Sequence, residues 1–186
     1  MVTAGDLKTG QVIRLDGELY HVLDYQHVKP GKGGAYLKTR LKNMRSGVIV
    51  EKSLRAGEKV DKVFLERKKV EYLYREQDLF CFMDHTNYAQ ILLSPQQVGG
   101  ARDLLKENEV CTALVNNSEV LSIELPVFVE LKVTGAEPGV RGDTAAGATK
   151  RARLETGVEI QVPLFVEEGD TVRIDTRKQE YVERVS

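Results

Sequence analysis

Short runs of alternating apolar and polar residues cover most of the chain, and this pattern is typical of half-buried β-strands. Near the start, Asp16-Gly17 separates two such runs and signals a tight hairpin. A glycine-rich segment, 29–34, separates the second run from the third. We expect residues 1–65 to form one small β-barrel. Its predicted strands are 12–15, 18–25, 35–43 and 48–50.

Two further groups of predicted strands follow. Within the second group, Ser-Pro-Gln-Gln at 94–97 supplies an N-cap serine, a proline at the first helical position and a glutamine three residues after the cap. This capping box predicts a helix of about ten residues that runs toward Lys106. Pro126 marks the next boundary, because proline cannot donate to a central ladder. The predicted strands are 70–74, 80–83, 91–93, 110–115 and 120–123, then 129–133, 158–162, 171–175 and 181–185.

These clusters predict an all-β protein of three small barrels in tandem, 1–65, 66–127 and 128–186. The last two are of the OB type, with one short helix in the second. No stretch approaches the roughly 18 apolar residues of a membrane-spanning helix. The first residues lack the basic-then-apolar layout of a signal peptide. Cys81 and Cys111 fit no metal-ligand spacing, so we expect two buried free thiols in a cytoplasmic protein.

Charge is distributed unevenly, although the whole chain has a net charge of −1. Residues 27–55 contain eight lysines and arginines and one acid (net +7), and the remainder has 19 bases and 27 acids (net −8). Such a basic segment is typical of a polyanion-binding end, and it is also compatible with a solvated face that has no partner. Lys38, Arg40 and Lys42 alternate with mainly apolar residues, which places the three cations on one face of the predicted strand 35–43.

The sequence contains no recognisable catalytic motif. Gly31-Lys32 is followed by glycine, where a phosphate-binding loop of the Walker type would have serine or threonine. Neither a His-Glu-x-x-His helix nor a Gly-x-Ser-x-Gly elbow is present. The histidines, His21, His27 and His85, lie on separate predicted elements without ligand spacing. We therefore expect a protein that is not an enzyme, with no catalytic residue, metal or cofactor.

The loop at 29–34, Lys-Pro-Gly-Lys-Gly-Gly, remains as the most distinctive feature. Pro30 stiffens its start, and the glycines free its tip from Cβ crowding. The pattern predicts that Lys32 stands at the apex of a hairpin above the basic strand, where its side chain can enter a narrow phosphate-lined cleft. Taken alone, the same pattern also fits a flexible turn with an incidental lysine.

Segment 29–35 resembles the modified-lysine loop of the bacterial elongation factor P family. The last third of the chain resembles that family's signature, and Arg151 stands where members commonly have proline. The resemblance extends from 6–10 to 179–182. The signature residues, at the expected spacings, are Lys150, Ala152, Gly157, Ile160, Val162, Pro163, Val166 and Gly169.

The resemblance implies a non-enzymatic translation factor with an N-terminal KOW-like barrel and two OB-like barrels, arranged as an L that mimics tRNA. It implies binding to the 70S ribosome beside the P-site peptidyl-tRNA when synthesis stalls at consecutive prolines. The residue matching Lys32 would reach the peptidyl-transferase centre, either unmodified or lengthened by a lysine-modifying enzyme.

Several residues carry the expected RNA contacts, and we expect the chain to act as a monomer. Contacts with tRNA and ribosomal RNA are expected from Lys29, Lys32, Lys38, Arg40, Lys42 and Arg45. The resemblance also implies a decoding-side contact near messenger RNA for Gly142, Asp143 and Thr144.

Two alternatives remain open on the sequence alone. An elongation-factor-P-like paralogue would share the fold and differ in its loops, and Lys32 within Pro-Gly-Lys-Gly favours the main family. A general single-strand RNA-binding OB protein would use aromatic stacking platforms. Tyr36 is the only tyrosine, phenylalanine or tryptophan in the basic segment 27–55.

Overall fold

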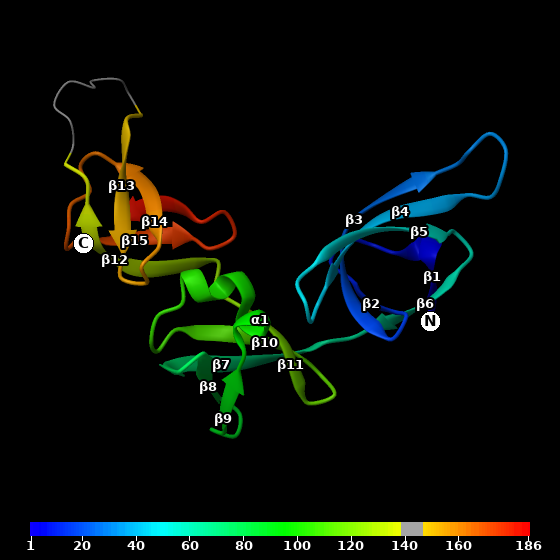
Figure 1. Ribbon diagram of the computed structural model, residues 1–186, viewed down its shortest axis with the longest axis horizontal. Coiled ribbons are helices and arrows are strands. Elements are labelled where there is room, and N and C mark those ends of the chain that lie inside the picture. Colours follow the sequence, from blue (N-terminus) through cyan, green and yellow to red (C-terminus); the bar gives the residue numbers. More distant parts are fainter. Residues whose placement is uncertain (139–146) are drawn as a thin grey trace. The chain divides into compact units, whose positions relative to one another are not determined.

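A computed structural model describes residues 1–138 and 147–186, and its strands form three sheets (Figure 1). The first sheet has the strand order β1-β6-β2-β3-β4-β5, and a short 3-10 helix, Ala4–Asp6, follows its first strand. The strands are β1 (Val2–Thr3), β2 (Val12–Leu15), β3 (Glu18–Val28), β4 (Tyr36–Asn43), β5 (Ile49–Arg55) and β6 (Lys59–Val63).

The hairpin between β2 and β3 follows from its two turn residues. Asp16 and Gly17 have φ values of 53° and 81°, and Leu15 pairs directly with Glu18. Positive φ at both central residues matches the right-handed twist of the flanking strands. Apolar side chains on the inner face then form one core. They are Ala4, Leu7, Ile13, Val22, Leu37, Leu41, Leu54 and Val60.

The second sheet has the order β11-β10-β7-β8-β9. Tyr72 contributes to its buried side together with Phe80 and Phe82, whose ring centroids lie 6.0 and 5.4 Å from that of Tyr72. The strands are β7 (Glu66–Glu76), β8 (Leu79–Asp84), β9 (Gln90–Leu93), β10 (Val110–Asn116) and β11 (Glu119–Glu124).

The helical segment after β9 begins as expected and ends sooner. Ser94 caps α1 (Pro95–Val98), and Gln97 completes the capping box. Gly99 then has φ 60° and ψ −140°, far from helical values, and a 3-10 helix (Gly99–Asp103) follows. The continuous helix of about ten residues is therefore replaced by two short pieces, because glycine permits a backbone conformation that ends the first one.

The third sheet has the order β14-β13-β12-β15-β16. Strands β13, β1 and β6 are additional to those predicted from the sequence. Only Ala152 and Leu154 of β13 are buried, and charged residues fill most of its other positions, so its apolar alternation is short. The strands are β12 (Phe128–Ala136), β13 (Thr149–Leu154), β14 (Glu159–Pro163), β15 (Thr171–Asp175) and β16 (Glu180–Arg184).

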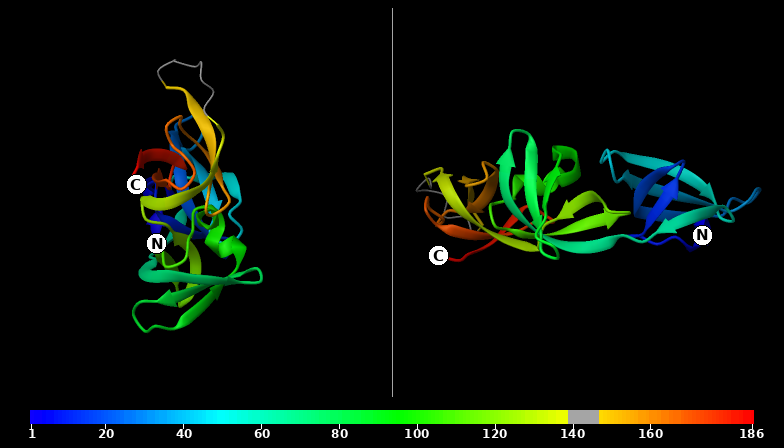
Figure 2. Two further views of the ribbon diagram at one scale, coloured as in Figure 1. Left: turned by 90° about the vertical axis from the view of Figure 1, so that its left-hand side faces the viewer. Right: turned by 90° about the horizontal axis from the view of Figure 1, so that it is seen from below.

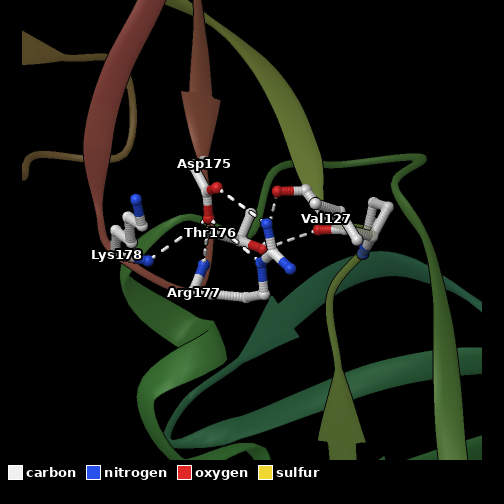
Figure 3. A network of polar contacts seen from close by, with 6 residues as sticks. Val127, Asp175, Thr176, Arg177 and Lys178 are labelled. Carbon is white, nitrogen blue, oxygen red and sulfur yellow. Dashed lines mark hydrogen bonds and ion pairs between the residues drawn. The ribbon is translucent and has the colours of Figure 1, made fainter.

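The turn after β15 is held by one carboxylate (Figure 3). Asp175 accepts hydrogen bonds from the backbone N–H groups of Arg177 and Lys178, at 2.9 and 3.3 Å. The Arg177 guanidinium also donates to Asp175, at 3.0 Å. This charge-assisted bond, followed by backbone donors, holds the pKa of Asp175 below its usual range. Thr176 ties the turn to the start of β12 by donating to the carbonyls of Pro126 and Val127.

The strands divide into two units, 1–67 with 114–122 and 68–113 with 123–186. The three sheets can be followed from two further sides in Figure 2. The predicted all-β fold class, with a short helix in the middle third, is confirmed. Cys81 and Cys111 are buried free thiols, as expected, and burial raises the pKa of Cys111 to about 12. Within the described ranges, no helix is long and apolar enough to cross a membrane.

Candidate nucleic-acid interface

Strand β4 presents its cations on one face. Lys38, Arg40 and Lys42 are exposed, and the residues between them are buried. Thr39 is the polar exception on the buried face, with 2% exposure. Its hydroxyl donates to the carbonyl of Lys52 at 2.9 Å, which satisfies the buried group. The folded strand therefore shows the alternation of exposed cations and buried residues that the sequence predicted.

The three cations of β4 differ in the charge of their cross-strand neighbours. Arg40 lies opposite Asp24 on β3 and Glu51 on β5, so two carboxylates flank its charge. Lys38 lies between two neutral residues, Gln26 and Ser53. The two neighbours of Lys42 are His21 and Ile49. The net positive charge of this face therefore comes mainly from Lys38 and Lys42.

The loop between β3 and β4 extends beyond the strands that carry it (Figure 1). Residues 29–35 are all exposed, including Lys29 and Lys32. Gly33 has φ 115°, in the region that side chains rarely adopt. A Cβ at this position would also contact Pro30, 3.8 Å from its Cγ. The loop therefore depends on glycine at position 33, and Lys32 at its tip has an exposed side chain.

Two other cations of the basic segment have acidic partners. Lys52 donates to Asp16 at 2.8 Å, which raises the pKa of Lys52 and lowers that of Asp16. Its ammonium group also lies 5.4 Å from the centre of the Tyr20 ring. Arg45 pairs with Glu119 at 3.4 Å. The eight residues of β4 separate Arg45 from the Lys32 loop by roughly 25 Å of extended chain.

The expected RNA-binding set is therefore not one cluster. Lys29, Lys32 and Lys38 lie on the loop and at the adjoining end of β4, and Lys42 lies farther along the same face. Arg45 lies past the other end of the strand. The three residues of the expected decoding-side loop, Gly142, Asp143 and Thr144, lie outside the residues that the structure describes.

An open hollow lies at the loop end of the basic face, and it was not predicted from the sequence. Tyr36 and Arg55, which are direct cross-strand partners, stand in its lining. Ser53, Leu54, Glu58 and the small residues of two loops complete it. Arg55 belonged to the basic segment, but its position beside Tyr36 follows only from the pairing of β4 with β5. Period-two alternation along 49–55 is the one sequence signal that could have placed Arg55 outward.

The histidines, cysteines and acids of the described residues bear on whether the protein could hold a metal ion. Among residues 1–138 and 147–186, no group of three or more histidines, cysteines or acids is placed to hold a metal ion. His85 contacts Glu71 at 2.9 Å, and His21 and His27 lie on the first sheet, away from that pair in sequence and sheet. The arrangement offers cationic and aromatic groups for binding.

Three family models cover nearly the whole chain. They are the elongation factor P KOW-like domain at residues 3–60, the elongation factor P OB domain at 65–123 and the elongation factor P C-terminal domain at 129–184. The chain belongs to the elongation factor P family. Members of this family are non-enzymatic translation factors, and membership decides against a general single-strand RNA-binding protein.

Two relatives match over nearly their full length. Elongation factor P of Natranaerobius thermophilus is 49% identical over 185 residues, which is 100% of this chain and 98% of the relative. Elongation factor P of Moorella thermoacetica is 50% identical over 184 residues, 99% of this chain and 100% of the relative.

A solved structure shares the fold over part of the chain. It is a eukaryotic translation initiation factor 5A from Methanococcus jannaschii, with a TM-score of 0.52 and 23% identity over 67% of this chain and 90% of that chain. At this identity the likeness concerns the fold alone.

Proposed function

We propose that the chain binds the 70S ribosome beside the peptidyl-tRNA and promotes peptide-bond formation at consecutive prolines, with Lys32 as its functional tip. The observation that carries the proposal is the solvated Lys32 on a glycine-rich loop, continuous with the face of Lys38 and Lys42, in a member of the elongation factor P family.

The proposed mechanism is positioning. Proline is a poor substrate for peptide-bond formation because its ring fixes φ and its nitrogen is secondary. A slender cationic tip that holds the end of the peptidyl-tRNA in an attack-ready geometry lowers the barrier through orientation and entropy. Such a mechanism needs no general base on the factor, since the ribosomal RNA supplies the catalytic centre.

The charges along the hairpin indicate that its cations contribute unequally to RNA binding. Lys38 and Lys42, without acidic cross-strand neighbours, suit RNA phosphates, and Lys29 and Lys32 continue that charge onto the loop. Arg40 contributes less because Asp24 and Glu51 flank it. The acidic remainder of the chain limits indiscriminate binding to RNA, so the basic end is the one that docks.

The rest of the proposed organisation follows the family. We place barrel boundaries near 65 and 127, and the loop with Gly142, Asp143 and Thr144 near messenger RNA. The factor would act in the cytoplasm as a monomer. A lysine-modifying enzyme would lengthen the reach of Lys32, and intact mass of the protein from its native host tests for such an extension.

The decisive experiment replaces the tip. Lys32→Ala should strongly slow synthesis through a Pro-Pro-Pro stretch in a reconstituted translation system, because the cation that positions the tRNA end is gone. Its melting temperature should stay within about 1–2 °C of wild type, since the side chain is exposed. Lys32→Arg should also fall short, because guanidinium keeps the charge but differs in shape and cannot take a lysine-specific extension.

Lys8→Ala is the matched control, since Lys8 is an exposed lysine outside the basic segment. It should translate the same message at the wild-type rate. If Lys32→Ala relieves polyproline stalling as well as wild type does, Lys32 is not the functional tip, and the positioning mechanism is refuted as well.

A further inference from the structure

The hollow at the loop end of the basic face combines an aromatic ring, a cation and open space. Tyr36 and Arg55 are cross-strand partners and line it side by side. Gly34 and Gly57 lie on its two loops, and a Cβ on either would meet nothing within 4 Å. The floor is therefore open enough to receive a flat group beside the half-buried ring.

Arg55 lines this hollow, and Lys38 lies next to it, opposite the lining residue Ser53; both cations are available to a ligand. Within the described part of the chain, neither the Arg55 guanidinium nor the Lys38 ammonium has an ion-pair partner. The backbone of Arg55 contacts Glu58, since its N–H donates to the Glu58 carboxylate at 3.1 Å and its carbonyl accepts from the Glu58 N–H at 2.9 Å. The guanidinium is left to bind an outside acceptor, and arginine suits phosphate oxygens because of its forked donors.

The lining favours a nucleotide over a bare phosphate. A free anion would need donors on several sides, but Glu58 stands in the same lining and repels negative charge. A base has no net charge, stacks on aromatic rings and can offer amino groups to a carboxylate. The hollow therefore matches a base on its Tyr36 and Glu58 sides and a phosphate on its Arg55 side.

We infer that the hollow beside Tyr36 binds one unstacked nucleotide of RNA, with its base on the Tyr36 ring and its phosphate against Arg55 and Lys38. This inference rests on the proposed function, and it adds a second anchor at the base of the loop. The first anchor is Lys32 at the tip. A fixed nucleotide below the tip would set the angle at which the loop approaches its target.

The test measures equilibrium binding to ribosomes at several salt concentrations. Tyr36→Leu should weaken binding by about 5- to 150-fold, the range that stacking of one base on one ring provides. Tyr36→Phe should stay within about twofold of wild type, because the ring remains. Arg55→Gln should reduce the salt slope by about one unit, whereas Tyr36→Leu should leave that slope unchanged, because only the arginine replaces a counterion on phosphate.

A variant that fills the hollow tests the site without touching ring or charge. A Cβ at position 57 would meet nothing within 4 Å, so Gly57→Leu should weaken binding while melting like wild type. Tyr88→Leu is the control, because Tyr88 is an exposed tyrosine on the second sheet's turn at 73% exposure, and it should bind as wild type does.

Ultraviolet cross-linking identifies the occupant. Irradiated wild-type complexes should give a nucleotide adduct on the peptide that contains Tyr36. Loss of that adduct on ribosomes without P-site tRNA assigns the nucleotide to tRNA, and its persistence assigns it to ribosomal RNA. An adduct with a ribosomal protein, or wild-type binding by both Tyr36→Leu and Gly57→Leu, would overturn the inference. Lys32→Ala, run in parallel, would still lose polyproline rescue in that case, so the two failures are distinguishable.

Discussion

Eight cations share residues 27–55, and the side chains around each decide what its charge can do. Lys52 is already bound to Asp16, so its charge is partly neutralised within the protein. Arg40 is flanked by two acids across the sheet. Lys38 has neutral cross-strand neighbours and is free to meet phosphate. Net charge along the segment therefore overstates the charge that an RNA would encounter.

At position 33 the backbone itself is the constraint. Gly33→Ala should lower the free energy of unfolding of the first unit by about 1 kcal/mol, because φ 115° is strained for any side chain. Gly34→Ala is the matched control, since its φ lies outside that region and its Cβ would meet nothing within 4 Å. Urea unfolding measures both. Equal stability of the two variants would show that the loop relaxes without cost.

The carboxylate of Asp175 makes stability depend on pH. Its pKa is lowered in the folded protein, so its stabilising contribution is present above the ordinary pKa of about 4 and is lost as pH falls through the lower folded value. Asp175→Asn should therefore be less stable than wild type near pH 7, and the difference should shrink as pH falls toward about 2. Thermal unfolding across this range measures the change.

Asp78→Asn is a suitable comparison for the pH experiment, because the Asp78 side chain is 91% exposed. The thermal stability of Asp78→Asn should stay close to that of wild type at every pH. If Asp175→Asn is less stable than wild type by the same amount at all pH values, the ionised carboxylate does not hold the turn.

At the scale of elements, β4 sets the spacing of the interface. Its alternation faces Lys38 and Lys42 outward and buries Leu37 and Leu41 completely. Residues four apart on a strand lie about 13 Å from each other, so the two lysines suit two separate phosphates. The same strand begins at the Lys32 loop. The tip and the phosphate contacts are therefore held by one rigid element.

Replacing both lysines tests that role. Lys38→Ala with Lys42→Ala should weaken ribosome binding and flatten its dependence on salt by roughly two units of slope, one for each lost phosphate contact. Lys52→Ala is the comparison, because Lys52 is bound to Asp16, and it should leave the slope unchanged. Unchanged affinity and slope in the double variant would mean that the face serves only to keep the protein in solution.

At the scale of the molecule, one residue of the middle third packs into the core of the third sheet. Leu104 follows the 3-10 helix of the middle third, yet it is 1% exposed in the core cluster of the third sheet, with Leu131 and Ile174 among its members. Lys106 also donates to the backbone carbonyl of Glu130. Residues 68–113 and 123–186 therefore share apolar core and belong to one unit.

Leu104→Ala should accordingly destabilise the second unit by about 2–5 kcal/mol, the cost of a cavity at a buried leucine. Leu92→Ala, at a leucine that is 49% exposed, should cost much less. Hydrogen exchange resolved by residue should show faster opening on both sides of position 104 in the first variant. Faster exchange in the third sheet only, or in the middle one only, would contradict a shared core.

The sequence by itself determined the local features. The Asp16-Gly17 turn, the outward cations of β4 and the capping box at Ser94 each depend on residues a few positions apart, so periodicity and turn chemistry reveal them. The motifs of the elongation factor P family were also visible in order. Weakly patterned strands such as β13 were not, because two buried side chains do not make a recognisable period.

Only the tertiary structure decided which side chains meet across strands. The pairing of β4 with β5 places Arg55 beside Tyr36, and the fold brings Asp16 to Lys52. Packing also carries Leu104 into the core of the third sheet. These contacts join residues 19 or more positions apart, and their register comes from burying a whole sheet face at once. No short window of sequence contains that information, so the free cations and the hollow emerge only in the folded chain.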